Sequence, residues 1–96
     1  MKIQLKASAV FKSAMGGEVS GELDVEGKTI IEILRELSNR YGDAFRELIF
    51  DHESGNVREG LMILVNGRQY RYLPRKMDQE LENGDVLAIS PPIVGG

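Results

Sequence analysis

The sequence predicts an α+β domain in which one main amphipathic helix lies on one face of a mixed sheet of about four to five strands. Three observations predict it: alternating apolar residues near the start, helical spacing of apolar residues over 30–41, and two continuous apolar runs in the second half. The elements follow the order hairpin, helix, hairpin, final strand. Because a single helix can cover only one face of a sheet, this order indicates the β-grasp arrangement. We assign residues 1–90 to the domain and residues 91–96 to an extended tail.

The first hairpin is predicted from period-two alternation, which is typical of a strand with one buried face. The apolar residues of the first strand, over residues 2–11, are Ile3, Leu5, Ala7, Ala9 and Phe11. A turn at Met15-Gly16-Gly17 follows, and the alternation resumes with Val19, Leu23 and Val25. These two runs are interpreted as one β-hairpin, with Gly21 as a weak point or bulge in its second strand.

The helix is predicted to begin after Thr29 and to end at Gly42. Thr29 and Glu32 have the spacing of a capping box, in which each side chain accepts a hydrogen bond from the other residue's backbone N–H. The apolar positions form one stripe at helical spacing, and they are Ile30, Ile33, Leu34, Leu37 and Tyr41. Glycine at the end of such a stripe favours termination, because it tolerates the left-handed conformation found there.

The second half of the chain predicts a short helical turn over 44–50, a polar surface loop over 51–60 and a second hairpin. The loop contains His52, which we interpret as an exposed residue without a role. Leu61 to Val65 is the first strand of the hairpin, Asn66-Gly67 is its turn, and Gln69 to Leu73 is its second strand. Asn-Gly favours a type I′ turn because both central residues need positive φ. A last turn precedes the final strand, residues 86–89.

Two surface features are candidates for an interface with a partner. The apolar runs at 61–65 and 86–89 are too continuous for strands that have one solvent-exposed face. Either the outer face of the sheet is partly apolar and available to a partner, or these are central strands in which Met62 or Leu64 is incidentally exposed. Arg68, Arg71, Arg75 and Lys76 concentrate positive charge near the second hairpin. They could steer docking onto an acidic surface, or they could simply guard a solvated edge strand.

Composition excludes several classes of function. The net charge is −3, whereas a nucleic-acid binder needs a basic footprint. There is no cysteine and one histidine, which excludes thiol chemistry and two-histidine metal sites. No apolar run approaches a membrane span, and no signal peptide is recognisable. We therefore expect a cytoplasmic domain without membrane contact, without a metal or cofactor of its own, and without autonomous catalysis.

The most informative segment is the end of the chain, Pro-Pro-Ile-Val-Gly-Gly. Pro91 and Pro92 favour an extended backbone that projects away from the domain. Six residues reach roughly 20 Å at about 3.3 Å each, enough to enter a partner's active site. Gly95 and Gly96 lack Cβ atoms and could pass through a channel as narrow as the backbone. Activation of the terminal carboxylate needs another protein, because the sequence has no phosphate-binding P-loop.

The residues LENGDVLAI followed by SPPIVGG resemble the end of the MoaD/ThiS family of ubiquitin-like sulfur carriers, in particular the small subunit of molybdopterin synthase of archaeal type. The matching positions are Leu81, Gly84-Asp85, the strand 86–89, Pro91-Pro92, Ile93 and Gly95-Gly96. Val94 departs from the pattern, because the family usually has Ser, Ala or Thr at that position. The helix ending in Tyr41-Gly42 and the segment LMILVNGR match as well, so the resemblance covers most of the chain.

The resemblance implies a mechanism and a set of partners. An E1-like adenylating enzyme would use MgATP to form an acyl-adenylate on Gly96, and a sulfurtransferase would convert it to a thiocarboxylate. The tail would then enter the large subunit of molybdopterin synthase and give its sulfur to a pterin precursor. ATP, zinc and the pterin would bind to these partners.

Three alternatives stay open. The chain could carry sulfur for thiamin thiazole or for tRNA thiolation. It could instead be a ubiquitin-like modifier whose Gly96 is conjugated to lysines, or a β-grasp interaction module whose terminus is accidental. The first two share the activation step with the molybdopterin pathway and differ only in the nucleophile that follows.

Overall fold

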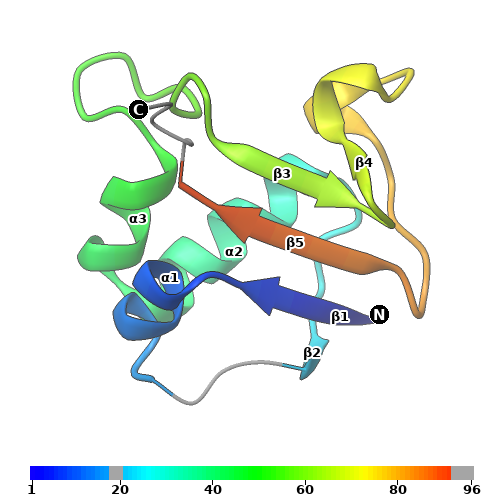
Figure 1. Ribbon diagram of the computed structural model, residues 1–96, viewed down its shortest axis with the longest axis horizontal. Coiled ribbons are helices and arrows are strands. Elements are labelled where there is room, and N and C mark those ends of the chain that lie inside the picture. The colour runs from blue at the N-terminus through cyan, green and yellow to red at the C-terminus, as the bar shows by residue number, and fades with distance from the viewer. Residues whose placement is uncertain (18–20, 92–96) are drawn as a thin grey trace.

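A computed structural model describes residues 1–17 and 21–91 of the chain. A five-stranded mixed sheet forms one layer, and its strand order is β2-β1-β5-β3-β4 (Figure 1). Strands β1 and β5 are parallel neighbours in its interior, and the other pairs are antiparallel. The strands are β1 (Lys2–Ala7), β2 (Gly21–Asp24), β3 (Met62–Val65), β4 (Arg68–Gln69) and β5 (Val86–Ser90).

The helices lie on one side of this sheet and leave its other face open toward the viewer in Figure 1. They are α1 (Ala9–Ala14), α2 (Ile30–Tyr41) and α3 (Asp43–Ile49), and two short 3₁₀ turns follow at Tyr70–Tyr72 and Lys76–Asp78. The predicted β-grasp architecture is confirmed, with α3 matching the helical turn expected at 44–50. None of the helices in the described ranges is long and apolar enough to cross a membrane.

The predicted first strand is wrong beyond Ala7. The chain leaves the sheet at Ser8 and forms helix α1, which buries Phe11 against the core. A helix places Phe11 and Met15 on one face, four residues apart, and both are buried. Strands β1 and β2 still pair as predicted, with Ile3 opposite Leu23, although α1 lies in their connection. The predicted strand position Val19 lies outside the described residues.

Helix α2 begins and ends as predicted. Its capping box is complete, because the Glu32 N–H donates to Thr29 Oγ1 at 3.2 Å and the Thr29 N–H donates to Glu32 Oε1 at 3.1 Å. The backbone N–H and the hydroxyl of Thr29 both donate hydrogen bonds to the Glu32 carboxylate. They stabilise its charged form and lower the pKa of Glu32 below the ordinary 4.5. Gly42 ends the helix with φ +92, a conformation that favours glycine.

The second hairpin is confirmed at its turn, but its second strand is shorter than predicted. Asn66 and Gly67 have φ values of +51 and +84, as a type I′ turn requires. Strand β4 contains only two residues, because the chain then turns into the 3₁₀ helix at Tyr70–Tyr72. Three residues apart on that turn, Tyr70 and Leu73 both pack against the core, which a straight strand would not allow.

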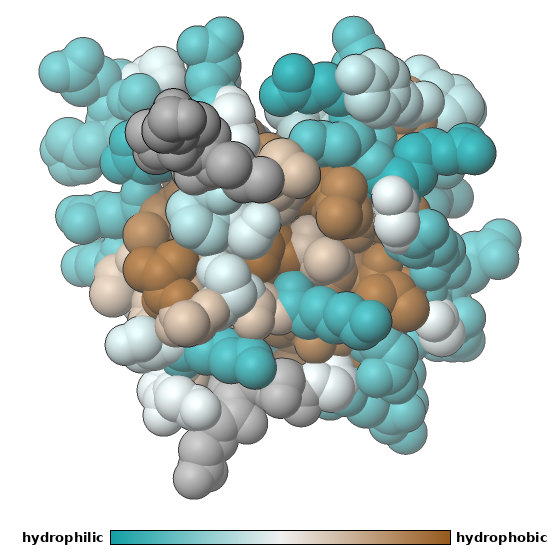
Figure 2. Space-filling view, in the orientation of Figure 1, coloured by the Kyte–Doolittle hydropathy of each residue, from teal (hydrophilic) through white to brown (hydrophobic). Residues whose placement is uncertain are grey.

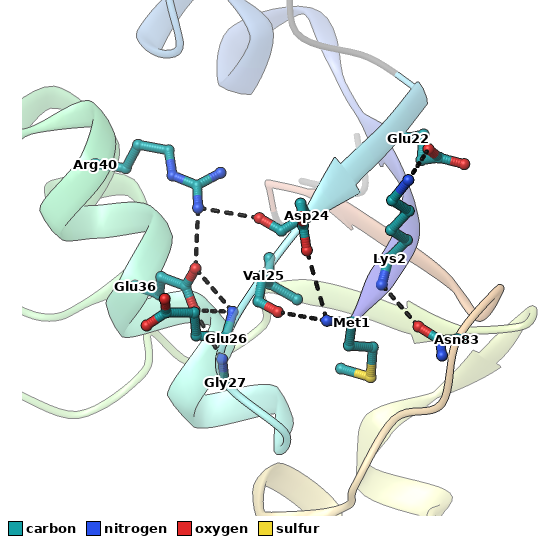
Figure 3. A network of polar contacts seen from close by, with 10 residues as sticks. All are labelled: Met1, Lys2, Glu22, Asp24, Val25, Glu26, Gly27, Glu36, Arg40 and Asn83. Carbon is teal, nitrogen blue, oxygen red and sulfur yellow. Dashed lines mark hydrogen bonds and ion pairs between the residues drawn. The ribbon is translucent and has the colours of Figure 1, made fainter.

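A carboxylate on α2 fixes the turn that joins β2 to this helix (Figure 3). Glu36 accepts hydrogen bonds from the backbone N–H groups of Glu26 and Gly27, the latter at 2.8 Å. It also pairs with Arg40 at 2.9 Å. Gly27 approaches α2 so closely that an added Cβ would lie 3.0 Å from the Glu32 backbone. This contact holds the first hairpin against the main helix.

Candidate functional site

The tail begins at the end of the interior strand β5. Ile89 is paired with Ala7 on one side, and Ser90 is paired with Met62 on the other. The Ser8 N–H donates to the Ile89 carbonyl at 3.1 Å and continues this pairing beyond β1. Pro91 follows directly and is exposed. The base of the tail is therefore held by hydrogen bonds on both sides.

The remaining predicted tail residues lie outside the described residues. They are Pro92, Ile93, Val94, Gly95 and Gly96. What the structure establishes is the point from which they depart. That point is the same end of the sheet at which Met62 opens strand β3.

An apolar strip runs along the middle of the open sheet face, and we call it the outer strip. It consists of the half-buried side chains Met62, Leu64, Val86 and Ala88. Leu64 is paired with Ala88, so β3 and β5 contribute neighbouring positions. Figure 2 shows apolar surface over these two strands, and a further apolar area lies over α1, where Val10 is exposed.

The strip exists because β3 and β5 are apolar on both faces. Their alternate residues Ile63, Val65, Leu87 and Ile89 are buried beneath the helices. Strand β1 is different, since its outward residues Gln4 and Lys6 are polar and exposed. A strand that is apolar on both faces normally has both faces covered, so the outer strip is a surface suited to a partner.

The rim of the strip carries polar groups from both neighbouring strands. Gln69 on β4 lies opposite Leu64, and its Nε2 is 3.1 Å from the sulfur of Met62. On the other side, Lys2 forms an ion pair with Glu22 at 3.7 Å. An apolar centre with a polar rim is the usual composition of a protein–protein interface.

The structure brings together some of the predicted interface residues and separates others. Met62 and Leu64 share the outer strip. Arg68 is paired with the buried Val65, which places it on the opposite face of the hairpin from Leu64. Arg71 and Arg75 are exposed in the 3₁₀ segment beyond β4. The three arginines are therefore not part of the outer strip.

Val86 and Ala88 are members of the strip that the sequence did not single out. The signal was available, because the apolar run at 86–89 must place alternate residues on opposite faces of the sheet. What the sequence could not supply was the choice of face.

A separate hollow lies between α2, α3 and the loop after α3. It is an open groove of about 600 Å³, whose lining includes Arg35, Arg46, Phe50, Asp51 and His52. Arg46 is already engaged by Asp43 at 2.6 Å. The backbone N–H groups of Glu53 and Ser54 donate to Asp51 and lower the pKa of its carboxyl. His52 is exposed.

Comparison with known proteins gives consistent matches over most or all of the chain. A model of the ThiS family matches residues 13–96. The small archaeal modifier protein 3 of Haloferax volcanii is 30% identical, and the alignment covers all of both chains.

Two solved structures extend this result. The small archaeal modifier protein 1 from Methanosarcina acetivorans superimposes with a TM-score of 0.80 at 27% identity, over 99% of this chain and 96% of the other. A putative molybdopterin converting factor, subunit 1, from Pyrococcus furiosus gives a TM-score of 0.69 at 28% identity, over 97% of this chain and 99% of the other.

Proposed function

This chain belongs to the ThiS family, and on that premise we propose that it is a ubiquitin-like sulfur carrier whose reacting group is the C-terminal carboxylate of Gly96. In this proposal the domain is a recognition handle, and the tail carries the chemistry. The chain itself supplies only the reacting carboxylate of Gly96. Partner enzymes supply the catalysis.

The first step is activation of the carboxylate by an E1-like adenylating enzyme. A Gly96 carboxylate oxygen attacks the α-phosphate of MgATP, pyrophosphate leaves, and an acyl-adenylate forms. A sulfur nucleophile provided by a sulfurtransferase then attacks the acyl carbon, and AMP leaves. If that nucleophile is the outer sulfur of a cysteine persulfide, the product is an acyl disulfide. A thiol then attacks the donor's sulfur, which leaves a thiocarboxylate on Gly96 and the donor cysteine in a disulfide with that thiol. ATP and any zinc bind to these partners.

The observation that carries the proposal is the position of the tail's base. Strand β5 ends at Ser90 with hydrogen-bonded neighbours on both sides, and the SPPIVGG ending begins there. A partner that covers the outer strip would therefore contact the domain next to the point where the tail departs. Docking on Met62, Leu64, Val86 and Ala88 would orient the tail toward the partner's active site.

We assign the sulfur to molybdopterin synthesis, with the large subunit of molybdopterin synthase as acceptor and a pterin precursor as its substrate. The similarity to the putative molybdopterin converting factor of Pyrococcus furiosus supports this assignment. So does the Pro-Pro step before the final four residues. Thiamin thiazole synthesis and tRNA thiolation are the neighbouring pathways that a sulfur carrier of this kind could serve.

A second candidate function is conjugation of Gly96 to lysines of other proteins. It is favoured by the 30% identity to a relative named a small archaeal modifier protein. Both functions need the same adenylate. They differ in whether a sulfur nucleophile or a lysine amine attacks it.

Intact-mass spectrometry of the protein from its native cells tests the proposal. We expect a population whose mass has increased by the replacement of one oxygen by sulfur, and a Gly96 deletion variant that lacks it. Probing the same cells with an antibody gives the second readout. Unmodified carrier together with lysine-linked conjugates would favour the modifier function, and sulfur transfer retained after the deletion would exclude both.

A further inference from the structure

The segment of residues 66–77 carries a concentrated positive charge in an acidic protein. It contains Arg68, Arg71, Arg75 and Lys76 and no acidic residue. Since the whole chain has a net charge of −3, these four cations leave −7 on the rest of the sequence. Charge of one sign gathered in so short a segment creates a local field that the protein as a whole does not have.

The two 3₁₀ turns present this charge on a fixed support. Tyr70, Leu73 and Met77 pack against the core and anchor the segment. Backbone hydrogen bonds hold it closed, including Lys76 N–H to Leu73 carbonyl at 3.1 Å. The residues between the anchors face solvent, and we call them the basic turn: Arg71, Tyr72, Arg75 and Lys76.

The side chains of the basic turn are unengaged. None of its three cations forms an ion pair or a side-chain hydrogen bond with another residue in the described ranges, so all three are available to a partner. Tyr72 is 75% exposed, which is unusual for an aromatic side chain. Tyrosine and arginine are the residue types enriched at energetically important positions of interfaces.

Protection of a sheet edge does not account for this cluster. Charged residues guard an edge strand where its backbone groups remain unpaired. Strand β4 ends at Gln69, so that role extends to Arg68 at most. Arg71, Arg75 and Lys76 lie beyond the sheet. In addition, Lys76 keeps a φ of +51, a strained conformation for a residue that is not glycine.

We propose that the basic turn docks an acidic segment of a protein partner, one with two or more carboxylates and an apolar side chain to pack on Tyr72. Arg71, Arg75 and Lys76 would pair with the carboxylates. A nucleic acid fits less well, because the remaining −7 charge would repel its backbone. This inference does not depend on the chemistry of the tail and holds for a sulfur carrier and for a modifier.

Fluorescence anisotropy with a labelled peptide of glutamates around a central leucine tests the proposal. We expect salt-sensitive binding that weakens by about tenfold or more in the Arg71→Glu/Arg75→Glu variant, and by several-fold in Tyr72→Ser. The matched control is Lys28→Glu/Arg35→Glu, which changes the net charge equally at exposed positions near and on α2. This control should bind within about twofold of the wild type.

Three results would overturn the proposal. One is no binding of the peptide by the wild type at low salt. Another is equal weakening in both double variants, which would mean that net charge alone decides. The third is that the wild type binds a single-stranded oligouridylate more tightly than the peptide and that Arg71→Glu/Arg75→Glu abolishes this binding. That result would make the basic turn a nucleic-acid site. Circular dichroism of each variant checks that the fold is retained.

Discussion

Ala88→Glu separates the stability of the domain from recognition of its outer strip. Ala88 lies in the middle of the strip, between Lys6 on β1 and Leu64 on β3. Its side chain is half-buried in the free protein, so a glutamate there can reach water. Once a partner covers the strip, the same carboxylate is buried in an apolar surface.

The size of the effect follows from these neighbours. Burying a carboxylate in an apolar interface costs several kcal/mol, and we take about 3 kcal/mol. Lys6 lies directly across and can offset up to about 1 kcal/mol through an ion pair. About 2 kcal/mol remains, which corresponds to a roughly 30-fold weaker interaction. In the free protein, the ion pair between Lys6 and the introduced carboxylate keeps the free energy of unfolding of the Ala88→Glu variant within about 1 kcal/mol of the wild type.

The assay is ATP–pyrophosphate exchange catalysed by the adenylating enzyme, measured over a range of carrier concentrations. We expect the KM for the carrier to rise by about 30-fold, with little change in the denaturation midpoint. Ala44→Glu is the matched control, because it places the same charge on the exposed first turn of α3. If Ala88→Glu supported exchange as well as Ala44→Glu does, the outer strip would not be the surface that the activating enzyme recognises.

Three further predictions concern the support of the site, and denaturant unfolding measures each. Glu36→Ala should lower the free energy of unfolding by about 1–3 kcal/mol, because the Gly27 N–H and its neighbour lose their acceptor; an unchanged midpoint would contradict this. Thr29→Ala should cost about 1 kcal/mol at neutral pH. The pKa of Glu32 is lowered in the folded state, so this contribution is present above pH 4.5 and should shrink as the pH falls through the folded pKa. A Thr29→Ala deficit that stayed constant down to pH 3 would refute the coupling. Lys76→Gly should stabilise by about 1 kcal/mol by relieving the positive φ, and any destabilisation would show that the strain argument is wrong.

The sequence predicted correctly those elements whose local residues favour only one structure. The capping box of α2 and the Asn66-Gly67 turn depend on local chemistry alone, and both are confirmed. Helix α1 was not predicted, because Phe11 fits the core-facing pattern of a strand and that of a helix equally well. It continues the alternation of β1, and it also lies four residues from Met15 as a helix requires. Over so short a segment, the strand period of two residues and the helical period of 3.6 residues cannot be distinguished.

The outer strip was predicted only in part, for a related reason. In β3 and β5 every residue is apolar except Ser90, so alternation alone does not say which residues face the helices. A shift of one residue would exchange Ile63 for Leu64 without changing the pattern. Pairing with β1 removes this ambiguity, because Leu5 is buried and lies opposite Leu87, which fixes Val86 and Ala88 on the open face.

The position of β5 also determines how firmly the base of the tail is held. A strand at the edge of a sheet frays easily, because half of its backbone groups have no partner. Strand β5 has hydrogen-bonded neighbours on both sides up to Ile89 and Ser90. Local opening of β2 or β4 at the two edges would therefore leave the base of the tail in place. The central strand of the sheet is the one that ends at Ser90, directly before Pro91. In the proposed function, a partner that binds the domain would position Gly96 from this fixed point.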